Sequence, residues 1–118
     1  MSDERDEIYL QHILERIDRI ELYTKEGKTN FFDSTLTQDA VIQNLIVIGE
    51  AVKNLSLDIR NRYPDIPWKR IAGLRDVLIH QYFGIDIYSV WEVIVKDLPF
   101  LKERISTILK QIKNANNV

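Results

Sequence analysis

The stretch that decides the fold reads DAVIQNLIVIGEAVKNLS, residues 39–56. Its apolar residues recur at the three- and four-residue spacing of a helix, and the run Leu45–Ile48 makes that helix apolar on every side. Such a helix lies at the centre of a bundle or is shared with a second chain. Gly49 lies inside it, where glycine costs about 1 kcal/mol relative to alanine, so we expect another backbone to approach closely there.

The residues before this stretch predict a first helix. Its apolar stripe, at helical spacing, consists of Leu10, Ile13, Leu14, Ile17 and Ile20. The polar run 25–30 contains a glycine and several turn formers and should separate this helix from the central one. We expect the central helix to begin near Thr37.

Prolines divide the second half of the chain. Pro67 is typical of the first turn of a helix, which predicts a third helix ending near His80, with Asp65 as its cap. Asp86 is placed to cap a last helical region. Pro99 should kink or split that region, because proline lacks a backbone donor and clashes with the preceding turn.

These patterns contain no strand-length alternation, internal repeat or interdomain linker. The sequence therefore predicts an all-α fold, a single helical bundle of four to five helices. We expect one domain over residues 1–118, with a frayed tail over 113–118.

Composition narrows the function. The chain has 118 residues, no cysteine, and 18 acidic against 16 basic residues, for a net charge of −2. A disulfide scaffold, a thiol nucleophile and a cysteine-bound zinc site are excluded, and a generally basic nucleic-acid coat protein is disfavoured. The polar start and the lack of a long apolar run predict a cytoplasmic protein without a membrane partner.

One segment, residues 53–75, departs from this acidic character and carries a net charge of +4. Its cations ahead of the motif described next are candidate RNA-binding residues: Lys53, Arg60, Arg62, Lys69 and Arg70. The competing interpretation is an ordinary solvated face, because charged side chains usually lie at the surface.

The segment ends in the run RDVLIHQY, residues 75–82. Arginine binds phosphate through two parallel contacts, and histidine moves protons near neutral pH, so Arg75 and His80 suit phosphate chemistry. Asp76 lies four residues before His80 and could orient its ring. Arg75 and His80 are about 140° apart around a helix, so converging on one ligand requires a looser helix or a curled arginine. The competing interpretation is a helix-end histidine that caps carbonyls or pairs with Asp76.

RNA cleavage by transfer to the 2′-hydroxyl needs one group to remove a proton and another to donate one. We expect His12 to be a plain surface residue, so one chain offers a single suitable histidine. Two chains related by a two-fold axis would supply two copies of Arg75 and His80, and the central helix with Gly49 is a candidate interface. No metal-ligand spacing is present, so we expect neither a metal nor a cofactor. Trp68, Trp91 and Phe83 are interpreted as core residues.

The pattern R-x-x-x-x-H-x-Y, formed by Arg75, His80 and Tyr82, resembles the signature of HEPN-domain ribonucleases, in particular HepT-like toxins. The surrounding sequence is similar as well, over 39–56 with its Gly-Glu-Ala and over 66–86. The resemblance implies an all-helical homodimer whose paired motifs form a metal-independent RNase site. Glu50, within Gly-Glu-Ala, is a further site-supporting candidate.

The resemblance also implies roles for the motif residues. Arg75 would hold the scissile phosphate and His80 would transfer protons, while Asp76 would orient the site and Tyr82 would line it. Relatives are commonly paired with a minimal nucleotidyltransferase antitoxin, which is thought to attach AMP to the motif tyrosine, here Tyr82. The alternative function is a non-catalytic helical module that binds a nucleotidyltransferase or a nucleotide without cutting RNA.

Overall fold

The structure is a computed structural model that describes residues 2–81 and 84–116. Over these residues helices are the sole regular secondary structure, joined by short turns and loops, which confirms the predicted all-α fold class. In chain order the helices are α1 (Ser2–Tyr23), α2 (Lys28–Asp33), α3 (Thr35–Lys53), α4 (Leu57–Arg62), α5 (Trp68–His80), α6 (Ile87–Glu92), the π-helical segment η2 (Val93–Asp97) and α7 (Leu98–Asn116). The described part thus holds more helices than the four to five expected, because short helices fill the connections.

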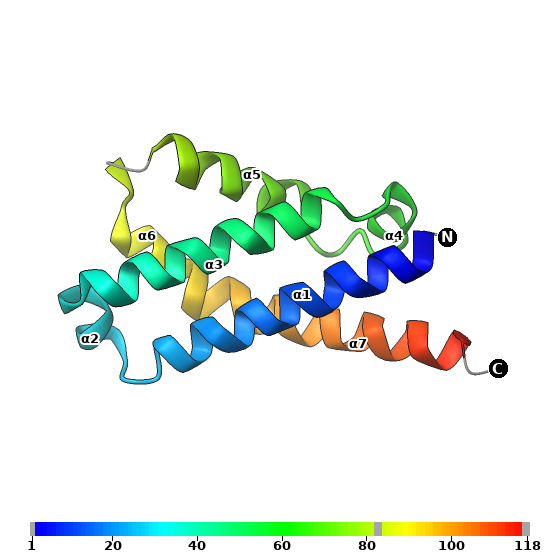
Figure 1. Ribbon diagram of the computed structural model, residues 1–118, viewed down its shortest axis with the longest axis horizontal. Helices are drawn as coiled ribbons and strands as arrows, with labels where there is room; N and C mark the ends of the chain where they lie inside the picture. The colour runs from blue at the N-terminus through cyan, green and yellow to red at the C-terminus, as the bar shows by residue number, and fades with distance from the viewer. Residues whose placement is uncertain (1, 82–83, 117–118) are drawn as a thin grey trace.

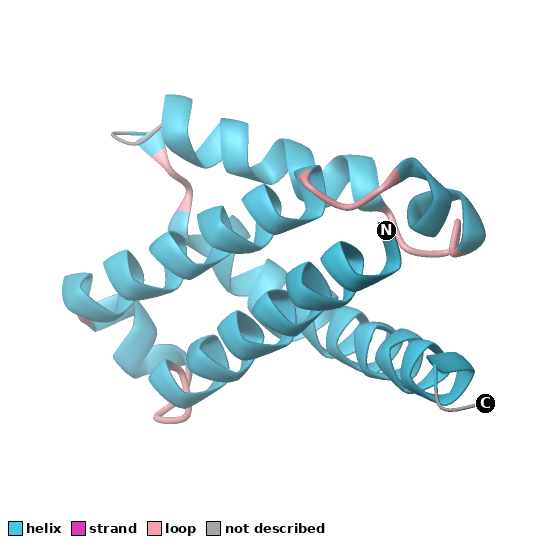
Figure 2. Ribbon diagram, turned by 45° about the vertical axis from the view of Figure 1, so that its right-hand side comes forward, coloured by secondary structure: helices cyan, strands magenta, loops and turns pink. Residues whose placement is uncertain are grey.

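The long helices run side by side and antiparallel (Figure 1). In that view α3 lies between α1 and α5, while α7 packs on α1 and crosses it at an angle in Figure 2. Both ends of the chain lie at the same end of the molecule, whereas the α1–α2 connection lies at the other (Figures 1 and 2). The central helix α3 therefore contacts both α5, which carries the motif, and α1.

The core lies where α1, α3 and α7 meet. The predicted stripe of α1 is fully buried at Leu10, Ile13, Ile17 and Ile20. α3 carries the largest set of buried residues in the described chain: Val41, Ile42, Asn44, Leu45, Ile48, Gly49, Ala51 and Val52. The interpretation of residues 39–56 as a central, buried helix is therefore confirmed.

The predicted close approach at Gly49 is confirmed, and the neighbour is α5 of the same chain. A Cβ built on Gly49 would lie 2.7 Å from Cβ of Arg75 and 3.1 Å from the carbonyl oxygen of Ile71. Gly49 therefore fits α5 against α3. The packing of α5 accounts for the glycine within one chain, and a chain interface along the central helix stays a prediction.

Of the two helix caps predicted from the sequence, that of Asp86 is observed and that of Asp65 is not. Ser34 caps α3 by accepting a hydrogen bond from the N–H of Thr37 at 3.1 Å, so the helix begins slightly earlier than expected. Asp86 caps α6 as predicted, accepting from the N–H of Tyr88 at 3.0 Å. Asp65 does not cap α5. Its carboxylate accepts a charged hydrogen bond from Nε of Arg104 at 2.7 Å instead.

Pro99 splits the last helical region, as predicted. Just before it, η2 widens the helix, and the N–H of Leu98 bonds the carbonyl of Val93, five residues earlier. Because the backbone hydrogen bonds of this wider turn reach five residues back, the helix can continue past Pro99, which has no N–H to donate. Beyond this point α7 continues to Asn116, further than the fraying expected from residue 113, because Ile112 still packs on the core.

Two of the predicted core residues are described, whereas Phe83 lies outside the described residues. Trp68 is buried, and its indole N–H donates to the carbonyl of Tyr63 at 2.9 Å. Trp91 is half-buried against Phe31, with ring centroids 5.2 Å apart. None of the described helices combines the length and apolar character needed to cross a lipid bilayer.

Candidate functional site

Arg75 lies on the second half of α5, against α3, and its side chain is 31% exposed. Its Nε is 2.6 Å from Oε2 of Glu50 on α3, and its Nη1 donates to Oδ1 of Asp76 at 2.8 Å. Gly49 allows the two helices to come this close. Two carboxylates thus hold the guanidinium in one orientation at the surface, with part of its edge open to solvent.

Asp76 links this arginine to a second cation. Nζ of Lys53 lies 3.9 Å from the same Asp76 oxygen that accepts from Arg75. The hydrogen bond from Arg75 is the main reason that the pKa of Asp76 lies below its ordinary value of 3.8, and the charges of Lys53 and His80 act in the same direction. Asp76 therefore stays ionised at neutral pH, within a chain of alternating charges that runs from Glu50 to Lys53.

His80 is the last residue of α5, and its side chain is exposed. Among the described residues, the hydrogen bond that Asp76 accepts comes from Arg75 and not from His80. The predicted pairing of Asp76 with His80 is therefore wrong in this structure, because the neighbouring guanidinium engages the carboxylate. α5 ends at His80, and Tyr82 lies outside the described residues.

Most cations of the basic segment are paired with acids, several of which lie outside it. Arg62 pairs with Asp58 at 2.7 Å, and Arg70 pairs with Asp97 at 3.3 Å. Arg60 instead donates to the carbonyls of Lys53 and Leu55, where it satisfies the end of α3. The local charge is thus weaker than a count along the sequence suggests.

Lys69 is exposed on α5, and within residues 2–81 and 84–116 it has no ion pair closer than 4 Å. Of the five RNA-binding candidates, Lys69 and Arg60 have no acidic partner within 4 Å in the described chain, and Arg60 is held by backbone carbonyls, so Lys69 is the more accessible of these two cations. In the same ranges, no group of three His, Asp or Glu side chains is close enough together to hold a metal ion.

A hollow beside Arg75 includes residues that the sequence did not single out. It has a volume of about 280 Å³ and is lined by Tyr9, His12, Ile46, Val47, Glu50, Ala51, Asn54 and Arg75. His12 is exposed, as expected, but it faces the same hollow as Arg75. Linear spacing could not show this, because α1 and α5 meet only through their packing on α3.

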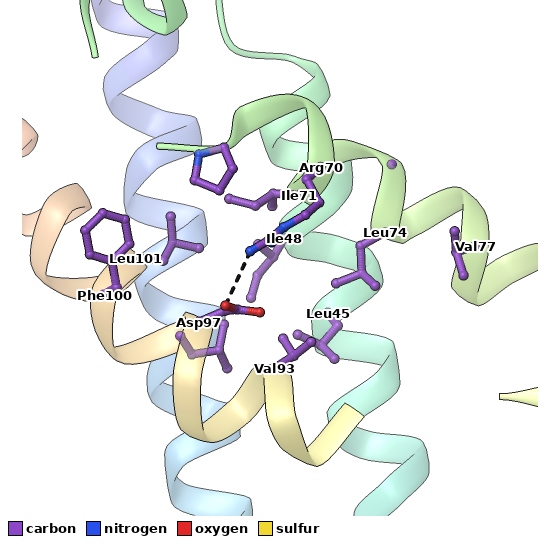
Figure 3. A pocket seen from close by; sticks show the side chains of 13 residues that line it. Leu45, Ile48, Arg70, Ile71, Leu74, Val77, Val93, Asp97, Phe100 and Leu101 are labelled. Atoms are coloured by element: carbon purple, nitrogen blue, oxygen red, sulfur yellow. Dashed lines mark hydrogen bonds and ion pairs between the residues drawn. The ribbon is translucent and has the colours of Figure 1, made fainter. Parts of the chain in front are cut away.

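A second, apolar groove lies on another face of α5 (Figure 3). It holds about 550 Å³ between α3, α5 and the start of α7, with Leu45, Leu74 and Phe100 among its lining residues. Arg70 reaches from α5 toward Asp97 across this groove. Its lining contains neither Arg75 nor His80, so the groove is separate from the motif residues.

Comparison with known proteins identifies the class of protein. Residues 13–108 match the family described as "Ribonuclease HepT-like". The chain is 42% identical over 103 residues to "Probable ribonuclease HepT" of Thermococcus cleftensis, a match that covers 86% of this chain and 94% of that protein. It is 44% identical over 106 residues to a "Putative RNase" of Methanocaldococcus jannaschii, covering 89% of this chain and 88% of that one.

A longer relative shares the same domain. The chain is 52% identical over 112 residues to a Methanocaldococcus jannaschii protein named "Gamma-glutamylcyclotransferase and putative RNase". The match covers 93% of this chain but spans only 50% of that relative. No solved structure matches the chain. The family match and the relatives together show that the chain belongs to the ribonuclease HepT-like family, and its class is that of a ribonuclease.

Proposed function

We propose that this chain is a metal-independent RNA endonuclease that acts as the toxin of a toxin–antitoxin pair. The observation that carries the proposal is the presence of Arg75 and His80 together, both reaching the surface of α5, in a chain of the ribonuclease HepT-like family. Arg75 and His80 are its catalytic residues, and Asp76 and Glu50 are positioning residues that act through Arg75.

Arg75 binds the scissile phosphate. Nε and one N–H of Nη1 are held by Glu50 and Asp76, which leaves the remaining N–H groups of Nη1 and Nη2 for phosphate oxygens. A guanidinium already fixed by the protein loses little freedom on binding and can stabilise the charge that develops on phosphorus during transfer. This arrangement supports the role assigned to Glu50.

His80 transfers the protons, and two copies of the chain are needed for the complete reaction. One His80 takes the proton of the 2′-hydroxyl as the 2′-oxygen attacks phosphorus. The bond to the 5′-oxygen then breaks, and that oxygen takes a proton from His80 of the second copy. The exposed, helix-terminal position of His80 supports this sharing, because a side chain buried within one protomer could not reach a joint cleft.

The cognate antitoxin is a minimal nucleotidyltransferase that transfers AMP from ATP to the hydroxyl oxygen of Tyr82, with release of pyrophosphate and of the hydroxyl proton. Tyr82 follows His80 by two residues, so an AMP group there would add a bulky negative charge beside the catalytic histidine. That charge would repel an RNA phosphate and block the cleft. Attachment of AMP to Tyr82 would thus silence the same site that cuts RNA.

RNA cleavage by purified chains tests the proposal. The wild-type chain should cut single-stranded RNA, and Arg75→Ala and His80→Ala should each lower the rate about 100-fold or more, because each removes a group acting in the transition state. Arg19→Ala is a matched control, since Arg19 is also a surface arginine in an ion pair, at 2.8 Å from Glu15. Circular dichroism should show unchanged helix content in all three variants.

Co-expression with a minimal nucleotidyltransferase of the proposed antitoxin class forms the second arm of this experiment. The chain should gain mass in AMP-sized steps and lose cleavage, whereas Tyr82→Phe should gain none. Full cleavage by both the Arg75 and His80 variants would overturn the catalytic assignment. A wild-type chain that binds RNA or the nucleotidyltransferase without cutting would instead favour the non-catalytic module.

A further inference from the structure

The hollow beside Arg75 joins three helices and has a distinct chemical layout. Tyr9 and His12 on α1 form one wall, with ring centroids 6.2 Å apart in an edge-to-face arrangement. Ile46, Val47 and Ala51 on α3 supply apolar side chains, while Arg75 on α5 forms part of the lining and also belongs to the catalytic motif. Figure 1 shows α3 between the other two helices. The hollow therefore extends from the proposed phosphate-binding group to a pair of aromatic rings.

Its polar groups favour a neutral ring system over a second phosphate. Glu50 contributes an ionisable carboxylate that would repel a phosphate oxygen placed in the hollow. Asn54 uses one N–H to bond the carbonyl of Glu50 at 2.9 Å, which leaves its second N–H and its amide oxygen for a ligand. An amide that can both donate and accept beside aromatic rings is the combination that reads unstacked bases in single-stranded RNA.

The volume sets the size of the occupant. About 280 Å³ lies just below the range of about 300–1,000 Å³ that is typical of small-ligand sites, so the hollow suits one nucleoside and not a longer segment. Because Arg75 lines the hollow, a nucleoside in it would have its phosphate next to the guanidinium.

We infer that this hollow is a nucleoside subsite, which holds one base of the RNA substrate against Tyr9 and His12 while Arg75 binds the adjoining phosphate. The inference rests on the proposed function and adds to it a substrate-positioning surface outside the R-x-x-x-x-H-x-Y motif. In this arrangement Tyr9 and His12 contact the substrate, Asn54 contacts the edge of the base, and proton transfer remains with His80.

RNA binding without cleavage tests the subsite. The probe is a labelled single-stranded RNA oligonucleotide, titrated into the full chain carrying His80→Ala so that it stays intact. Tyr9→Ala and His12→Ala should each weaken binding, Tyr9→Ala about tenfold or more, because a stacked base contributes substantially to affinity. Tyr9→Phe keeps the ring and should bind within about twofold of the parent. Tyr23→Ala replaces an exposed tyrosine on the same helix, outside the hollow, and should bind like the parent.

Two further measurements distinguish a loss of folding from a loss of binding, and an RNA base from a free nucleotide. Tyr9 packs partly on the core, whereas His12 is exposed, so His12→Ala reports on the subsite even if Tyr9→Ala is unstable. Unchanged affinity in folded Tyr9→Ala and His12→Ala chains would overturn the inference. If AMP binds as tightly as the oligonucleotide and loses the same affinity in both variants, the assignment to RNA is overturned. The hollow would then be a site for a free nucleotide.

Cleavage by the same variants with His80 intact distinguishes this inference from the proposed function. Tyr9→Ala should raise KM more than it lowers kcat, because the base contact serves binding more than proton transfer. Wild-type chains that bind RNA through Tyr9 but never cut would contradict the proposed function and leave the subsite standing. If His80→Ala abolishes cleavage while Tyr9→Ala and His12→Ala leave it unchanged, the proposed function stands and the subsite is contradicted.

Discussion

Arg75 shares its guanidinium between Glu50 and Asp76, and this sharing sets the charge state of the site. Because the pKa of Asp76 is lowered first by the hydrogen bond from Arg75 and then by Lys53, removing either cation should raise it toward 3.8. We expect a larger rise in Arg75→Ala than in Lys53→Ala. Carbon-13 NMR titration of the Asp76 carboxyl measures this directly.

The sign of the accompanying stability effect follows from linkage. A folded-state pKa below the unfolded one means that the Asp76 interaction stabilises the fold above the unfolded pKa and is lost as the pH falls through the folded pKa. The effect should therefore appear only at acidic pH, below about 4. Arg62→Ala, which removes the partner of Asp58, is the control. An Asp76 midpoint that stays equally low in Arg75→Ala would contradict the assigned cause.

At the scale of helices, Gly49 fixes how α5 lies on α3. In Gly49→Ala the new methyl group would lie 2.7 Å from Cβ of Arg75 and 3.2 Å from its backbone nitrogen, so α5 must move. Alanine stabilises a helix by about 1 kcal/mol relative to glycine, but overpacking between helices costs about 1–3 kcal/mol. We therefore expect Gly49→Ala to lower the free energy of unfolding or to leave it unchanged. Urea unfolding measures the change, and a clear increase in stability would contradict this packing.

The helices that could be predicted from the sequence are those with local signals. Periodicity and capping located α1, α3, α5 and the break at Pro99, because those signals are local. Helix α2 was expected to be part of a turn, and its formation depends on a distant contact: Phe31 is fully buried against Trp91 of α6. The site follows the same division. The motif residues were found from their spacing, but the spacing paired Asp76 with His80 and missed its contact with Arg75. The Glu50 pairing and the hollow with His12 depend on three helices placed in space.

At the scale of the whole molecule, Gly73 points to where a second copy would sit. It lies in the middle of α5, where glycine is unfavourable, yet no atom of the described chain lies within 4 Å of the Cβ position, apart from its own helix backbone and chain neighbours. On the same face of α5, one turn further along, Val77 is 48% exposed, and His80, two turns from Gly73, is exposed as well. In the proposed homodimer we therefore expect the partner's helix to approach α5 at Gly73, beside the exposed Val77, and to bring its His80 to the same cleft.

Gly73→Ala separates folding from dimer formation. Within a single chain the substitution meets nothing and raises helix propensity, so the monomer should gain up to about 1 kcal/mol of unfolding free energy. In a dimer packed at Gly73 the added methyl group separates the two helices, so the dissociation constant should rise and RNA cleavage should fall at low protein concentration, recovering at high concentration. Analytical ultracentrifugation measures the dissociation constant. Gly49→Ala is the matched counterpart, because the same change there acts within one chain. A Gly73→Ala chain that dimerises as tightly as the wild type would place the interface elsewhere, and a wild-type chain that cleaves RNA as a monomer would remove the need for one.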